Sequence, residues 1–127
     1  MKRNRKPHKN LEVWKLSVDF VKDIYTLTTN FPDEEKFGII SQLRRAVVSI
    51  PTNIAEGAAR STKKEFRNFL YIASGSLSEI DTLLTISKEL GFIKESQLDA
   101  LNEKLVKIDI MLDGLIKKLK KDMAKIK

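Results

Sequence analysis

The 127-residue sequence contains no cysteine and a single histidine, His8. This inventory excludes disulfides, iron–sulfur clusters, cysteine nucleophiles and Cys/His zinc sites. The histidine lies in the basic N-terminal segment, so the predicted bundle has no imidazole for acid–base catalysis or a Ser/His/Asp triad. The Glu-x-x-His pairs of di-iron bundles are also missing. We therefore expect no catalytic residue, no metal and no cofactor, and a protein that is not an enzyme.

Glycine and proline are scarce, with five and three residues, and long apolar runs are missing. The glycines stand alone rather than in the clusters of phosphate-binding loops. No segment approaches the roughly 18 apolar residues of a membrane span, and no signal-peptide core follows the basic start. The sequence therefore favours a cytoplasmic protein without a membrane segment.

What the chain does contain is enough apolar residue content for one folded domain. Hydrophobic residues make up 42% and charged residues 32% of the sequence, and this length supports one modest core. The net charge of +7 is uneven, because residues 1–10 and 117–127 each carry +5 and the remainder carries −3. The basicity therefore belongs to the two ends.

Four segments carry apolar residues at helical spacing, at about 11–30, 33–60, 62–91 and 96–119. The first is expected to bury the stripe Leu11, Trp14, Val18, Val21, Tyr25 and Thr28, flanked by Phe20, Ile24 and Leu27. The second is expected to bury Phe37, Ile40, Leu43, Val47, Ile50, Ile54 and Ala58. The third follows Phe66, Phe69, Leu70, Ala73, Leu77, Ile80 and Leu84, and the fourth has the heptads Leu98, Leu101, Leu105, Ile108, Leu112, Leu115 and Leu119.

Local residues predict where these helices begin and end. Asn10 and Asp33 are candidate N-caps of the first two helices, and Thr62 with Glu65 has the capping-box pattern. Gly91 predicts the end of the third helix. Pro51 interrupts the second helical pattern, and we expect one helix that is kinked there.

Short connections between long helices force sequential neighbours to be antiparallel. The sequence therefore predicts an all-α fold, an up-down-up-down four-helix bundle over residues 11–119. Residues 1–10 form a predicted disordered basic tail, and residues 120–127 a basic C-terminal tail.

The turn between the second and third helices is the strongest candidate site. Its cations, Arg60, Lys63, Lys64 and Arg67, surround a helix N-terminus, where free N–H groups already favour anions. A phosphate-binding patch is one interpretation, and a solvated turn balanced by Glu65 is the other. The tails add candidate nucleic-acid contacts at Lys2, Arg3, Arg5, Lys6, Lys9, Lys117, Lys118, Lys120 and Lys121, although lysines at a helix C-terminus also simply complement its dipole.

Two carboxylates inside the helices, Glu56 and Glu79, could act as an acid/base or metal pair, but hydrogen bonding at a helix seam is the favoured interpretation. The small residues near them, including Gly57 and Gly75, suggest a close helix approach. Arg44 or Arg45 could pair with Glu79 or Asp81, and the sequence leaves that choice open.

Three segments together resemble a known family: Leu11–Lys15 (LEVWK), Gln42–Gly57 (QLRRAVVSIPTNIAEG) and Glu65–Glu79 (EFRNFLYIASGSLSE). They are similar to the four-helix bundle proteins encoded in 23S rRNA intervening sequences, over about residues 10–118. The resemblance implies a bacterial cytosolic homopentamer related to the accessory proteins of diversity-generating retroelements, which bind nucleic acid and a reverse transcriptase. It implies no established molecular activity.

The leading functional hypothesis is a non-enzymatic oligomer that binds RNA or DNA through phosphates. Few exposed aromatic residues can be identified for base stacking, so we expect backbone contacts. The alternative is a protein-interaction scaffold that binds a protein partner and no nucleic acid. A ribonuclease of the helical-bundle type found in toxin systems ranks last. Such enzymes commonly use an Arg and a His a few residues apart, and the bundle segment has no histidine.

Overall fold

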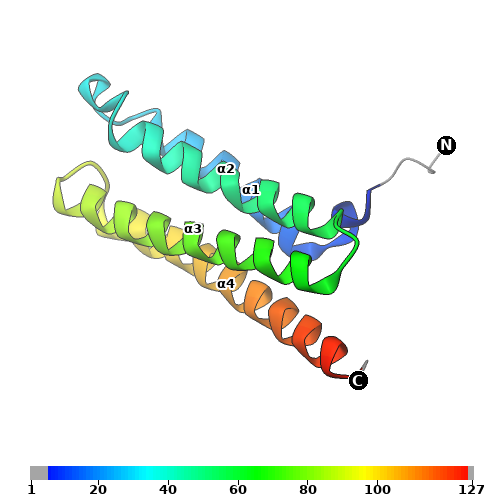
Figure 1. Ribbon diagram of the computed structural model, residues 1–127. Helices are drawn as coiled ribbons and strands as arrows, with labels where there is room; N and C mark the ends of the chain where they lie inside the picture. The colour runs from blue at the N-terminus through cyan, green and yellow to red at the C-terminus, as the bar shows by residue number, and fades with distance from the viewer. Residues whose placement is uncertain (1–5, 126–127) are drawn as a thin grey trace.

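The computed structural model describes residues 6–125 and confirms the all-α, up-down-up-down arrangement (Figure 1). Its helices are α1 (Glu12–Thr28), α2 (Ile39–Ala58), α3 (Lys63–Glu89) and α4 (Glu95–Ala124). Two short 3-10 helices, η1 (Pro7–Asn10) and η2 (Asp33–Glu35), precede α1 and α2. Each helix packs on the next in sequence, and α4 returns to α1 with the smallest contact. Within the described residues, no helix is long and apolar enough to cross a membrane.

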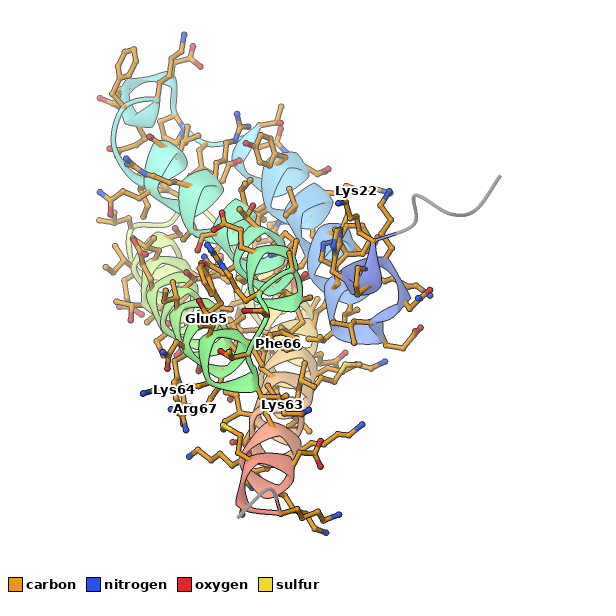
Figure 2. All side chains as sticks on the ribbon, turned by 45° about the vertical axis from the view of Figure 1, so that its right-hand side comes forward. Lys22, Lys63, Lys64, Glu65, Phe66 and Arg67 are labelled. Carbon is orange, nitrogen blue, oxygen red and sulfur yellow. The ribbon has the colours of Figure 1, made fainter. Side chains whose placement is uncertain are left out.

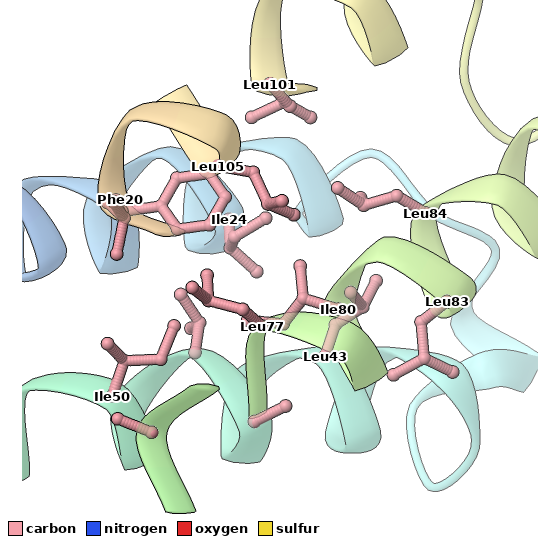
Figure 3. Close-up of a cluster of buried hydrophobic side chains, with 14 of the residues drawn as sticks. Phe20, Ile24, Leu43, Ile50, Leu77, Ile80, Leu83, Leu84, Leu101 and Leu105 are labelled. Carbon is pink, nitrogen blue, oxygen red and sulfur yellow. The ribbon is translucent and has the colours of Figure 1, made fainter. Parts of the chain in front are cut away.

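One continuous hydrophobic core runs between the four helices (Figure 3). Phe20 and Ile24 of α1 meet Leu43 and Ile50 of α2 and a row of aliphatic residues from α3, and all of these are buried. Each fully buried aliphatic or aromatic side chain contributes about 1.5–3 kcal/mol relative to an exposed one. The core therefore fixes the helix ends on which the candidate site depends.

The sequence predicted the wrong principal face for α1. Its buried residues are Val13, Ser17, Phe20, Ile24 and Thr28, whereas Val18 and Tyr25 are exposed. The α1 sequence is apolar over a wide arc, so its neighbours decide which stripe is covered. Phe37 was also expected in the core, but it precedes α2 and is 92% exposed.

Two predicted helix ends are confirmed and two are wrong. Thr62 caps α3, because the Glu65 backbone N–H donates to Thr62 Oγ1 at 3.2 Å; the reciprocal bond of the predicted capping box is replaced by one from Thr62 Oγ1 to the Glu65 carboxylate. Gly91 has φ +81° and ends α3, and the Phe92 N–H donates to the Ser87 carbonyl at 2.9 Å. By contrast, Asn10 ends η1 and Asp33 begins η2, so neither residue caps a long helix.

α2 continues through Pro51 without ending, as predicted for a single helix; the kink stays a prediction. Polar side chains bond to nearby carbonyls there, since Thr52 Oγ1 donates to the Val48 carbonyl and Asn53 Nδ2 to the Ser49 carbonyl, both at 2.8 Å. Ser49 also meets Ser76 of α3, with 2.6 Å between their hydroxyl oxygens. This contact sets the register of the α2–α3 pair.

Gly57 and Gly75 behave differently, although both were predicted to allow close helix packing. A Cβ on Gly57 would lie 2.8 Å from Phe66 Cδ1 and 2.8 Å from Phe69 Cβ, so α3 approaches α2 closely there. A Cβ on Gly75 would meet nothing within 4 Å. The prediction is therefore confirmed at Gly57 and wrong at Gly75.

The outer limits of the fold differ from the predicted tails. Pro7–Asn10 form η1 instead of belonging to a disordered segment, and the His8 ring packs edge-on against Trp14 with centroids 4.9 Å apart. At the other end, α4 continues to Ala124. Its buried stripe shifts from Leu112 to Ile116, where the heptad predicted Leu115, because a 3.6-residue turn drifts from a strict 3.5-residue repeat.

Candidate nucleic-acid interface

The structure gathers basic residues from three parts of the chain at one end of the bundle (Figure 1). The α2–α3 turn, the last turns of α4 and the first described residues all lie at this end. We call it the basic end and define it by Lys6, Lys9, Arg60, Lys63, Lys64, Arg67, Lys117, Lys118, Lys120 and Lys121. Basic segments that are far apart in the sequence thus lie at the same end of the bundle.

The Thr62 cap organises the α2–α3 turn and leaves its lysines in solvent. Thr62 Oγ1 donates to Glu65 Oε1 at 3.0 Å, which directs the Glu65 carboxylate to the cap without removing its negative charge. Lys63 and Lys64 are exposed and form no ion pair with any residue among 6–125. Lys64 and Arg67 extend from the outer side of α3, and Lys63 lies nearer α4 (Figure 2).

Arg60 is the most constrained cation of the turn. Its Nη2 lies 3.8 Å from Glu56 Oε2, and its guanidinium carbon lies 4.8 Å from the centre of the Phe69 ring. Both groups are about half exposed, so water screens the ion pair. Arg60 therefore has less charge available for a ligand than Lys63 or Lys64.

The end of α4 and the α2–α3 turn border a shallow cleft of about 410 Å³. Lys118 and Asp122 line it from α4, and Arg60 and Lys63 line it from the turn. Lys117 is paired with Asp113 at 3.0 Å, whereas Lys118, Lys120 and Lys121 form no ion pair within the described part of the chain. Because α4 continues to Ala124, Lys121 is the one of these lysines in its last turn, where a cation complements the helix dipole.

Sequence reasoning missed an exposed aromatic residue beside these cations. Tyr71 of α3 is 43% exposed. The Arg67 guanidinium carbon lies 6.0 Å from its ring centre, and Lys120 Nζ of α4 lies 5.6 Å from it. Arg67 Nε is buried and has no acceptor among the described residues. The helical pattern on α3 places Tyr71 one turn after Arg67, a signal that could have been used.

The N-terminal segment contributes less to the described structure than the sequence suggested. Lys6 and Lys9 are exposed around η1, at the basic end. The predicted contacts Lys2, Arg3 and Arg5 lie outside the described residues.

Comparison with known proteins places this architecture in a family. The profile of the 23S rRNA-intervening sequence proteins matches residues 9–114. The chain belongs to that family. A solved member of the S23 ribosomal protein family from Bacteroides thetaiotaomicron VPI-5482, a protein of unknown function, superposes with a TM-score of 0.77 at 27% identity, covering 83% of this chain and 95% of that one. Among curated proteins, no match is found.

In this member of the 23S rRNA-intervening sequence proteins, Glu56 and Glu79 do not form a site. Glu56 pairs with Arg60, and the register set by Ser49 and Ser76 carries Glu79 several turns away along α3. Arg44 pairs with neither of its candidate acids, because its Nε donates to Thr28 Oγ1 at 2.9 Å. Among the described residues, no three acidic or histidine side chains gather to hold a metal ion.

A second cleft of this family member, about 450 Å³ between α1 and α4, is lined by Lys104 and Asp23. Lys104 Nζ lies 2.6 Å from Asp23 Oδ2 and 2.9 Å from Asp19 Oδ2. The hydrogen bonds to Asp23 and Asp19 raise the pKa of Lys104, and the Lys104 hydrogen bond lowers the pKa of Asp19. A raised pKa keeps this amine protonated, so it joins two helices instead of acting as a nucleophile.

Proposed function

We propose that this protein is a non-catalytic, self-associating bundle that binds nucleic acid through phosphate contacts at its basic end. The observation that carries the proposal is the gathering of separate cationic segments there. Lys63, Lys64, Arg67, Lys118 and Lys120 have no acidic partner within residues 6–125, so their charges are available to phosphates.

Helix electrostatics support the same end as a phosphate surface. Lys63 and Lys64 occupy the first turn of α3, where the positive end of the dipole repels cations. An anion over this turn would satisfy both the lysines and the free backbone N–H groups of the helix start. Because phosphates carry no base identity, binding should be weakly sequence-selective.

A salt titration tests this proposal. Fluorescent single-stranded RNA and duplex DNA are titrated with the full chain at several salt concentrations, and the slope of log K against log salt counts the phosphates neutralised. The variant Lys63→Gln/Lys64→Gln should weaken binding and reduce the slope by about 1 for each lost contact. Lys22→Gln/Lys94→Gln is the matched control, because it removes equal charge at exposed lysines outside the basic end and outside both association surfaces. Absence of binding to either nucleic acid at about 50 mM salt would refute the proposal.

Self-association is supported by two complementary surfaces. The first, the Phe37 groove, holds an exposed Phe37 with Tyr25 and Val48 and is rimmed by Lys36, Arg44 and Arg45. The second, the outer face of α4, exposes Val106 by 51% and Ile110 by 66%, and Asp99 and Glu103 precede Val106 by about two turns and one turn on the helix. Apolar residues with cations on one surface suit apolar residues with acids on the other.

We propose that the Phe37 groove binds the outer α4 face of a second copy. Such a heterologous contact generates a closed ring when its rotation closes, which is the geometry of the homopentamer that the resemblance implies. The alternative function, a scaffold for another protein, would use the same apolar surfaces without nucleic acid.

Mass measurement on single and mixed variants tests the interface. Phe37→Glu destroys only the groove and Ile110→Lys only the α4 face, so each variant alone should be monomeric. Mixed together they retain one intact groove and one intact α4 face, and they should form a heterodimer that cannot grow. Ile72→Glu, at a similarly exposed apolar residue outside both surfaces, is the control. A parent chain that is monomeric, or variants that keep the parent mass, would contradict the proposed contact.

A further inference from the structure

The exposed Tyr71 ring and the bare helix next to it suggest a binding mode beyond phosphate contact. Arg67, Tyr71 and Gly75 follow one another at four-residue intervals, so they form one stripe on the solvent side of α3. Lys120 reaches the same ring from α4. The stripe begins at Lys64, inside the basic end.

Gly75 has no packing role that explains it. A Cβ there would meet nothing within 4 Å, whereas a glycine inside an exposed helix destabilises it relative to alanine. Helical side chains lean towards the N-terminus of their helix, so the residue four positions after Tyr71 is the one that would cover its ring from the C-terminal side. With glycine at that position, the ring is left open on that side.

The cations near the ring leave it available. Arg67 and Lys120 lie near the 6 Å limit for attraction between a cation and an aromatic ring. Because both side chains are long, their charged groups can move away from the Tyr71 ring. Arg67 also holds a buried Nε without an acceptor among the described residues. Turning this guanidinium towards a phosphate would give the Nε a partner and satisfy a donor that is costly to leave unpaired.

We infer that Tyr71 stacks on an unpaired base of single-stranded nucleic acid, while Arg67 and Lys120 bind the flanking phosphates and Gly75 gives the base access to the ring. This inference rests on the proposed function and narrows its ligand to single strands, whose bases are free to stack. Duplex bases are paired and stacked on one another, so a duplex could use only the phosphate contacts of the basic end.

Paired oligonucleotides separate stacking from charge. The full chain is titrated against a labelled oligouridylate of about 12 nucleotides and against an abasic strand of equal length, which has the phosphates without the bases. The parent should bind oligouridylate more tightly. Tyr71→Ala should lose about 5- to 150-fold in affinity for oligouridylate, the range for one stacked base, and little for the abasic strand. Tyr71→Phe should retain parental affinity.

Two further variants complete the test. Gly75→Leu should cover the ring and weaken oligouridylate binding, without lowering the melting temperature, because leucine favours helix and the surrounding space is open. Ile86→Ala, at a 41% exposed apolar residue of the same helix that lies outside the basic end and outside both proposed association surfaces, is the control and should bind as the parent does.

Equal affinity of the parent for the two strands, or unchanged oligouridylate binding by Tyr71→Ala or Gly75→Leu, would overturn the inference while the phosphate proposal stands. Failure of the parent to bind either strand or duplex at low salt would overturn both.

Discussion

Gly57 offers the sharpest test of how α2 and α3 pack. In Gly57→Ala, the new methyl carbon would lie 2.8 Å from Phe66 Cδ1 and from Phe69 Cβ, and 3.2 Å from the Phe66 carbonyl oxygen. Phe69 Cβ and the carbonyl belong to or adjoin the α3 backbone, so a rotamer change cannot relieve the clash. Overpacking of this kind costs about 1–3 kcal/mol, against a helix-propensity gain of up to about 1 kcal/mol for alanine.

The expected result is therefore a net loss of up to about 2 kcal/mol, which lowers the melting temperature by up to roughly 10 °C in a chain of this size. Gly75→Ala and Gly114→Ala are matched controls, because each meets nothing within 4 Å and should stabilise by about 0.5–1 kcal/mol. Far-UV circular dichroism melts at one fixed protomer concentration measure all three variants, since association makes melting concentration-dependent. A Gly57→Ala melting temperature at or above that of the parent would show that the close approach does not exist.

Three further substitutions test a helix cap, a helix end and a charged contact. Thr62→Ala removes the cap of α3 and should lower the free energy of unfolding by about 1 kcal/mol. In urea denaturation this appears as a lower midpoint at an unchanged m-value. Gly91→Ala forces a side chain into a φ of +81° and should cost about 1–2 kcal/mol in the same assay. Lys104→Met removes the partner that lowers the pKa of Asp19, so its stability should fall less than the parent's as pH drops through the acidic range. On the alkaline side, the parent should lose the contribution of Lys104 only above about pH 10.5, since the pKa of that amine is raised. A parallel pH dependence in the two proteins would show that Lys104 does not interact with Asp19 and Asp23 as described.

Features that depend on a few neighbouring residues could be predicted from the sequence. The N-cap at Thr62 and the stop at Gly91 involve partners within a few residues, and both are confirmed. The four helices followed from apolar periodicity for the same reason. The N-cap predictions at Asn10 and Asp33 were wrong because each residue belongs to a short 3-10 helix. Many residue types at the end of a loop can either cap a long helix or belong to such a 3-10 helix.

Features that depend on helix neighbours could not be predicted. α1 has apolar residues around much of its circumference, so periodicity alone cannot choose between the Val13–Phe20 face and the Trp14–Tyr25 face. Gly57 and Gly75 look alike in sequence, and only the register of α2 against α3 separates a close contact from open surface. The importance of Tyr71 was missed for this reason, because its exposure and its contact with Lys120 depend on where α4 lies.

Unequal helix lengths explain how the charges become segregated. α1 has 17 residues and α4 has 30, so they span about 26 and 45 Å. The acids of α1 reach only the first half of α4, where Asp19 and Asp23 bind Lys104. The lysines after residue 116 lie past the start of α1, next to the basic α2–α3 turn, while η2 carries three acids at the opposite end. A polyanion would therefore be steered towards one end. Adding salt should lower the association rate constant by a larger factor than it changes the dissociation rate constant.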